Sequence, residues 1–146
     1  MSKASDIALE IFARASQISI VNGYATDVGL TGFRGVKYLD PDSLPCFVLV
    51  EEESASSSRN VTRCLTTTPY VLEGHAVCSP THPNDAAHAI IADFKRAIFG
   101  GDLTFGQGVT EAAFNGAEID PRDEGRDLVA ARIRFSLSFV ENLAAP

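Results

Sequence analysis

The side chains able to bind a metal are few and scattered along this sequence. Its histidines are His75, His82 and His88, and its cysteines are Cys46, Cys64 and Cys78. Two metal ligands on one helix face require i, i+4 spacing, which His82 and His88 do not have. Cys78 and His82 form a lone C-x3-H pair, and a tetrahedral zinc site would need two further ligands, such as Cys64. We therefore expect no metal, histidines on the surface or in loops, and buried reduced thiols.

Signatures of nucleophilic catalysis and of nucleotide binding are absent from the sequence. It contains no G-x-S-x-G, and no cysteine opens a predicted helix, where its pKa would fall. The glycines of Gly29–Gly32 and Gly100-Gly101 are too sparse to cradle a phosphate. Gly106-Gln107-Gly108 is not followed by the helix that a dinucleotide fold needs. The sequence therefore predicts turn glycines, no cofactor and no enzymatic activity.

Carboxylates gather at two places, Glu51–Glu53 and a second cluster of Asp120, Asp123 and Glu124. Neither cluster has the spacing of an EF-hand loop. A solvated face is the ordinary explanation of such a cluster. An acidic ring on an oligomer is a further possibility.

Two segments have the apolar periodicity of amphipathic helices. The first runs from Ser5 to Ile18. The second runs from Asn84 to Phe99, with Asn84 as its expected cap and Gly100-Gly101 as its end. Its apolar stripe consists of Ala87, Ile90, Ile91, Phe94, Ala97 and Ile98. Asp93, Lys95 and Arg96 lie off this stripe, so we expect them to face solvent.

The remaining chain reads mainly as strands. Residues Val129 to Phe139 alternate strictly between apolar and polar, which predicts a strand with one buried face. Other strands are expected at Thr31–Leu39, at Cys46–Glu52, at Val61–Leu65 with Pro69–Cys78 (one kinked strand or two), and at Glu111–Ile119. The helices are not interleaved one per strand. The prediction is therefore α+β, a mainly antiparallel sheet with two helices on one face, in a single domain spanning residues 1–146.

Composition and charge limit the possible partners. The chain has 146 residues and a net charge of −7, from 19 acidic and 12 basic side chains. A surface that grips nucleic acid needs clustered Lys and Arg, although DNA could slide past an acidic one. Apolar runs such as Cys46–Val50 are far shorter than the roughly 20 residues that cross a bilayer. The polar N-terminus and the odd cysteine count predict a cytosolic protein without a signal peptide.

Several stretches along most of the chain carry a family resemblance. They are the first helix, Asn22-Gly23-Tyr24, Thr26-Asp27-Val28-Gly29, the strand after Pro45, the Tyr/Val-rich Pro69–Val77, the helix sequence IIADFKRAIF at Ile90–Phe99, and the final alternating strand. Together they resemble the tail terminator proteins of long-tailed bacteriophages. None of them is a catalytic signature, and related neck and tail-completion proteins share them in part.

The resemblance implies a structural virion protein at the head-proximal end of the tail, assembled in the host cytoplasm. Members of that family form a six-membered ring that ends polymerisation of the tail tube and offers a surface for head–tail joining. The implied partners are further copies of the chain in a hexamer, a tail tube protein and a head connector or stopper protein. DNA would pass through without specific binding, and no membrane would be involved.

Two surfaces are candidates for these roles. The tube-docking loop is assigned to Ser54, Ala55, Ser56, Ser57, Ser58, Arg59 and Asn60, a segment with little to bury, which we expect to be mobile and to order on docking. The acidic lumen is assigned to Glu51, Glu52 and Glu53, in preference to Asp120–Asp127, because a strand end is held rigidly. Two alternatives stay open: another phage neck or tail component, such as a head-completion or tail-tube protein, and a small cytosolic enzyme or ligand-binding domain.

Overall fold

Two long strands, β4 (Arg63–Val77) and β6 (Leu128–Asn142), pair antiparallel along their whole length. The other strands are β1 (Gly32–Arg34), β2 (Cys46–Glu51), β3 (Ala55–Ser58) and β5 (Val109–Asp120). The sheet order is β1-β2-β4-β6-β5, with β3 pairing β4 beside β2. The computed structural model describes residues 2–35, 43–120 and 127–146. In these ranges β1 with β2 is the one parallel pair, which confirms the mainly antiparallel sheet.

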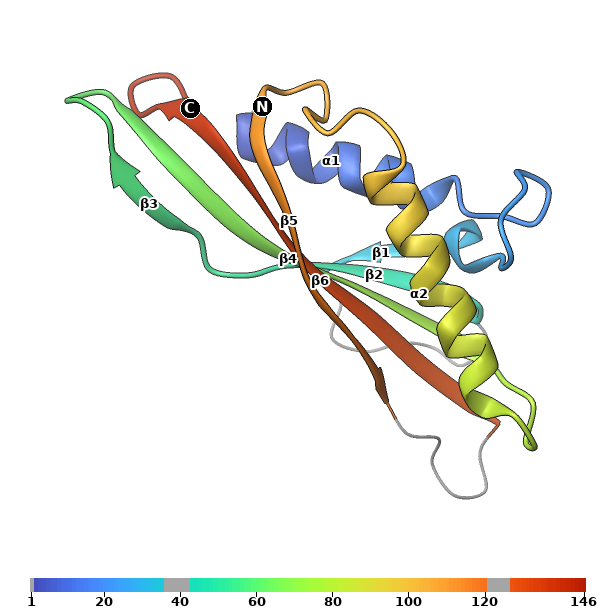
Figure 1. The fold of residues 1–146 in the computed structure, drawn as a ribbon. Helices are drawn as coiled ribbons and strands as arrows, with labels where there is room; N and C mark the ends of the chain where they lie inside the picture. The colour runs from blue at the N-terminus through green and yellow to red at the C-terminus, as the bar shows by residue number, and fades with distance from the viewer. Residues whose placement is uncertain (1, 36–42, 121–126) are drawn as a thin grey trace.

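Helices α1 (Lys3–Ser16) and α2 (Pro83–Phe99) cover the same face of the sheet (Figure 1). The strand β6 presents its apolar residues to them, and burial alternates from Val129 to Leu137 as the sequence predicts. Ser138, predicted on the polar face, is also buried. The helix α2 can lie close to β4 because Gly74 has no side chain: a Cβ there would lie 2.5 Å from Ile90 Cγ2. The α+β architecture with two helices on one face is therefore confirmed.

The helix ends differ in detail from the expectation. The side chain of Ser2 caps α1 by accepting a hydrogen bond from the Ser5 N–H at 3.2 Å. The helix α2 begins with Pro83, whose missing N–H costs nothing at the first helical position. The cap position is His82, whose side chain makes no capping bond, so the prediction that Asn84 caps this helix is wrong.

Asp93 is buried, contrary to the prediction that it faces solvent. Its side chain is 4% exposed and accepts hydrogen bonds from the N–H of Ala25 and from the N–H and Oγ1 of Thr26, at 3.2, 2.8 and 2.8 Å. Arg96 faces solvent but donates to the carbonyl of Gly23 at 2.8 Å. The polar side of α2 therefore holds the connection between α1 and η1 (Val28–Leu30) against the helical layer.

Residues Ser54–Asn60 do not form the mobile loop that the sequence predicts. Residues Ala55–Ser58 form the strand β3, which pairs antiparallel with Thr67–Cys64 of β4. The main chain supplies this pairing, so it needs no apolar side chain, and all four β3 residues are exposed. A prediction based on the apolar content of the sequence could not detect such a strand.

The strand β4 is one continuous strand, which settles the choice left open between one strand and two. Pro69 lies where its neighbour on one side changes from β3 to β2, because β3 pairs up to Thr67 and β2 begins at Tyr70. The expected strand Thr31–Leu39 is confirmed only at Gly32–Arg34, and residues 36–42 lie outside the described ranges. None of the described helices is both long enough and apolar enough to span a membrane.

We predict that Asp93→Ala lowers the free energy of unfolding by about 2–3 kcal/mol, because the N–H groups of Ala25 and Thr26 lose their charged acceptor. Urea denaturation measures the loss, and hydrogen exchange should quicken at Ala25 and Thr26. The control is Asp85→Ala, on an exposed residue in the first turn of the same helix, where the cost should stay below about 1 kcal/mol. Equal losses in the two variants would contradict a specific role for Asp93.

Candidate functional site

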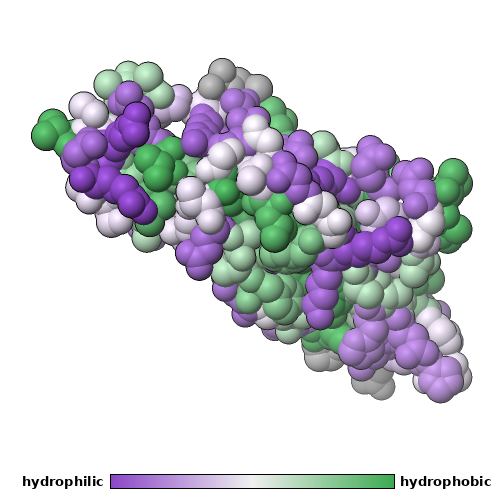
Figure 2. Space-filling view, turned by 45° about the horizontal axis from the view of Figure 1, so that its top comes forward, coloured by the Kyte–Doolittle hydropathy of each residue, from purple (hydrophilic) through white to green (hydrophobic). Residues whose placement is uncertain are grey.

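The hairpin of β3 and β4 projects beyond the two helices, as the left end of Figure 1 shows. At its tip the side chain of Val61 is 96% exposed, and that of Leu143, whose N–H donates to the carbonyl of Thr62 at 2.7 Å, is 56% exposed. Arg59 and Arg63 flank the tip and form no ion pair within the described residues. Figure 2 shows this end as mainly hydrophilic with a small hydrophobic patch at its extremity.

A ladder of hydroxyl groups holds the hairpin together. The Oγ of Ser54 lies 2.8 Å from Thr68 Oγ1, and the Oγ of Ser56 lies 3.1 Å from Thr66 Oγ1. Thr66 in turn donates to Glu141 of β6 at 2.7 Å. Cross-strand pairs of this kind stabilise a sheet without burying apolar surface. The projecting hairpin is therefore an ordered arm.

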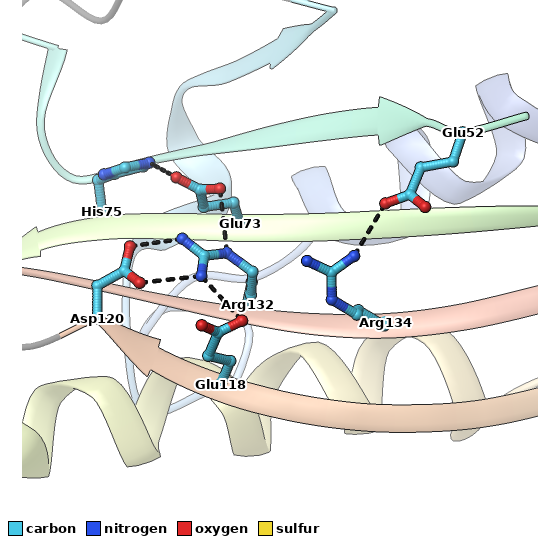
Figure 3. Close-up of polar contacts among 7 residues, drawn as sticks. All are labelled: Glu52, Glu73, His75, Glu118, Asp120, Arg132 and Arg134. Atoms are coloured by element: carbon cyan, nitrogen blue, oxygen red, sulfur yellow. Dashed lines mark hydrogen bonds and ion pairs between the residues drawn. The ribbon is translucent and has the colours of Figure 1, made fainter.

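The sheet face turned away from the helices carries an ion-pair network around Arg132 (Figure 3). Glu73 of β4 and Glu118 of β5 lie directly opposite Arg132 in the strand register. The guanidinium lies 3.3 Å from Glu73, 3.1 Å from Glu118 and 2.9 Å from Asp120. The network therefore joins three adjacent strands.

The network changes the acidity of its members. The pKa of Glu73 is lowered, mainly by its hydrogen bond with His75, whose Nε2 lies 2.7 Å away, and further by Arg132, while burial opposes the shift. Hydrogen bonding to Asp120 raises the pKa of Arg132 above its ordinary value against the effect of burial, and Glu73 and Glu118 add to the rise. Both groups are therefore charged at neutral pH.

Two of the three candidate lumen acids have basic partners. Glu51 lies 3.1 Å from Arg34, and Glu52 lies 2.9 Å from Arg134. Glu53 is exposed and has no ionic partner among the described residues. Of the alternative cluster, Asp120 is paired with Arg132, while Asp123 and Glu124 fall outside the described ranges. The acidic charge of Glu51–Glu53 is thus partly offset.

The side chains able to act as nucleophiles or metal ligands are buried or do not lie together. Cys46, Cys64 and Cys78 are free and buried, as expected, and burial raises the pKa of the Cys46 thiol. Burial and the nearby Glu51 raise the pKa of Tyr70 to about 12. In the part of the chain that the structure describes, no three His, Cys, Asp or Glu side chains gather as metal ligands would.

Sequence reasoning missed two of the residues that organise these surfaces. The alternation of β6 correctly puts Arg132 on the polar face, yet its partners follow only from the register of three strands. The sequence predicts that Val61 is part of a strand, and only its position between β3 and β4 identifies it as a tip residue.

We predict that Glu73→Gln removes a pH-dependent contribution to stability. Because the folded-state pKa of Glu73 is lowered, its contribution is complete above the ordinary pKa of 4.5 and is lost as the pH falls through the lowered pKa. Urea midpoints measured from pH 7 to pH 3 should therefore show the wild type losing its advantage over the variant only in the acid range. Glu53→Gln, on an exposed residue, is the matched control and should follow the wild type. An advantage independent of pH would contradict the charged role of Glu73.

Comparison with known proteins identifies the fold. No protein-family model matches this sequence, and no curated protein matches it. Among solved structures, a chain described as part of the virion of a native gene transfer agent (GTA) particle is similar, with a TM-score of 0.71 and 16% sequence identity. The match covers 96% of this chain and 98% of that chain. The two chains therefore share a whole fold and not an isolated motif.

Proposed function

We propose that this chain is a structural, non-enzymatic component of a phage-like virion. In this role it forms a hexameric ring that caps the tail tube, ends tube polymerisation and provides the surface for head–tail joining. The observation that carries the proposal is the fold match to a chain of the gene transfer agent virion over nearly the full length of both chains. The resemblance to tail terminators in several stretches of the sequence supports the finer assignment.

The contact between α2 and the segment after α1 gives that resemblance a physical basis. Thr26 belongs to one of the resembling stretches and Asp93 to another, and the two are joined by two hydrogen bonds of 2.8 Å. Two patterns far apart in the sequence are thus parts of one structural unit. This unit supports the helical layer and leaves the hairpin free for assembly contacts.

The hairpin remains our proposed contact with the tail tube, although it is ordered before docking. Next to Ser54–Asn60, the exposed Val61 and Arg63, which has no ionic partner in the described part of the chain, offer apolar and basic contacts together. Such a tip suits an acidic, partly apolar surface on the tube protein. Since the arm is already folded, docking would not incur the entropy cost of ordering a loop.

The opposite side of the ring would meet the head connector or stopper protein, and DNA would pass through the lumen. We propose Glu51, Glu52 and Glu53 as lumen residues that repel DNA. Arg34 and Arg134 compensate two of them, so the repulsion would rest mainly on Glu53, repeated in every subunit. Repulsion of this kind acts within about 8 Å at physiological salt.

Deleting the gene in a cell that produces the virion should give tails of uncontrolled length and unjoined heads, counted by electron microscopy. We predict that the double variant Val61→Asp, Arg63→Glu fails to restore normal particles although its far-UV circular dichroism is unchanged. The conservative pair Val61→Ile, Arg63→Lys should restore them.

In negative stain the purified chain should form closed rings or stay monomeric, whereas a tube protein would polymerise. Normal tails in the deletion strain would refute the capping role.

The lumen assignment is tested by changing Glu51, Glu52 and Glu53 to Lys together. Particles should still assemble, but DNA ejection should fall because the reversed lumen, with Arg34 and Arg134 left unpaired, attracts DNA. A triggered-ejection assay measures the loss. The control is Asp85→Lys with Glu10→Lys, which changes charge on the helical layer. Normal ejection in the triple variant would show that these acids only solubilise the particle.

A further inference from the structure

The two outer edges of the sheet at the hairpin end differ in their protection against strand pairing. Natural sheets protect exposed edges with bulges, charged side chains or proline. The edge strand β5 has two register shifts, at Val109/Glu111 and at Phe114/Gly116, and carries the acids Glu111, Glu118 and Asp120. The edge strand β3 has the sequence ASSS, pairs without a register shift and contains no charge or proline. It is therefore an unprotected edge.

The backbone groups on the open side of β3 can be identified from the hairpin geometry. The N–H of Arg59 donates to the carbonyl of Arg63 at 2.9 Å, so this pair is hydrogen-bonded. Antiparallel pairs alternate between bonded and non-bonded. Ser57 and Ala55 therefore bond to β4, while the N–H and carbonyl groups of Ser56 and Ser58 point away from the sheet.

The opposite edge contains a segment that fits this open side. Between its two register shifts β5 has an unshifted run, Glu111–Phe114, equal in length to Ala55–Ser58. The two segments lie at opposite ends of the same row of the sheet, because Ala55 pairs with Thr67, Thr67 with Ser138, and Ser138 with Glu111. Each neighbouring pair in this row is antiparallel, so β3 and β5 run in opposite directions, as two strands joined across copies would need.

We propose that the β3 edge of one copy pairs antiparallel with Glu111–Phe114 on the β5 edge of the next copy, continuing the sheet around the ring. This inference rests on the ring of the proposed function and names its subunit contact. Glu111 lies opposite Ser138 in a bonded pair, so on the open side of β5 the free backbone groups are those of Ala112 and Phe114. Bonding them to the free groups of Ser58 and Ser56 places Arg59, which has no ionic partner among the described residues, directly opposite Glu111. Ser56 lies opposite Phe114, which is 44% exposed in the single chain, so pairing covers apolar surface.

The contact joins two different edges, and this determines the assembly. A heterologous contact repeats from copy to copy and closes into a ring when the rotation permits. Pairing of β3 with β3 would instead give a two-fold dimer and leave both β5 edges open. Arg59 at the β3 edge would repel its own copy in such a dimer and attract Glu111 of the β5 edge, so the charges of the two edges favour rings over dimers.

Cysteine cross-linking tests the contact in the full-length protein. Opposed residues in an antiparallel pair have Cα atoms about 5.5 Å apart or closer, within reach of a disulfide. Mixing the Ser58→Cys protein with the Ala112→Cys protein under mild oxidation should give a covalent heterodimer, and the chain carrying both changes should give a ladder that stops at the ring size. The matched control, Ser58→Cys with Ala117→Cys, places the second thiol beyond the β5 register shift and should not cross-link. The native cysteines are buried and do not compete.

A second set of variants tests the contact without cysteine. Ser58→Pro removes an outward N–H while leaving the bonded pairs with β4, whereas Ser58→Thr keeps it. Arg59→Glu and Glu111→Arg should each weaken association by about fivefold, and the double variant should restore it. Sedimentation measures the association, and circular dichroism confirms folding.

The outcomes separate this inference from the proposed function. Cross-links between 58 and 112 together with restoration by the charge swap support the contact. Rings that persist in Ser58→Pro and show no 58–112 cross-link overturn it while leaving the ring in place. Cross-links of 58 with 58, or of 58 with 117, overturn it as well, as does a protein that neither associates nor cross-links at any concentration. The capping role is decided independently by tail length in the deletion strain.

Discussion

The full-length pairing of β4 with β6 is the interaction on which the rest of this structure depends. Each strand has 15 residues, which at strand geometry span about 50 Å. The longer helix, α2, has 17 residues and spans only about 26 Å. The helical layer therefore cannot cover the whole ladder, and one end of the sheet must extend beyond it. The projecting arm is a geometric consequence of two strands that are too long for their helices.

The same length difference explains the composition of the arm. Where no helix lies above the sheet, an apolar side chain would stay in water, so this end is stabilised by main-chain hydrogen bonds and by hydroxyl pairs such as Ser56 with Thr66. Under the helices, apolar alternation returns, with Phe135 fully buried and stacked on Tyr70 at 5.5 Å. One ladder thus consists of a core half and an arm half, and only the core half has the usual sequence pattern of a strand.

This division also explains what the sequence could and could not predict. The alternation of β6 and the apolar stripe of α2 reflect burial, so both elements and the α+β class follow from the pattern alone. The strand β3 is held by its partner's main chain and carries no such signal. Asp93 falls outside the apolar stripe, yet it is buried because Thr26, distant in the sequence, supplies its hydrogen bonds. The partners of Arg132 depend on strand register, which local periodicity does not specify.

The distribution of charged side chains makes the two outer edges of the sheet chemically different. The net charge is −7, yet Glu52, Glu73, Glu118 and Asp120 on the polar sheet face are all paired with arginines, and so is Glu51 on the face turned toward the helices. Among the described residues, acids without an ionic partner include Glu111 on the β5 edge, while Arg59 and Arg63 are unpaired at the hairpin. Opposite charges thus lie at opposite edges of the sheet, and repulsion opposes contacts between like edges. Because each edge attracts its opposite, these charges favour the head-to-tail association of the proposed ring.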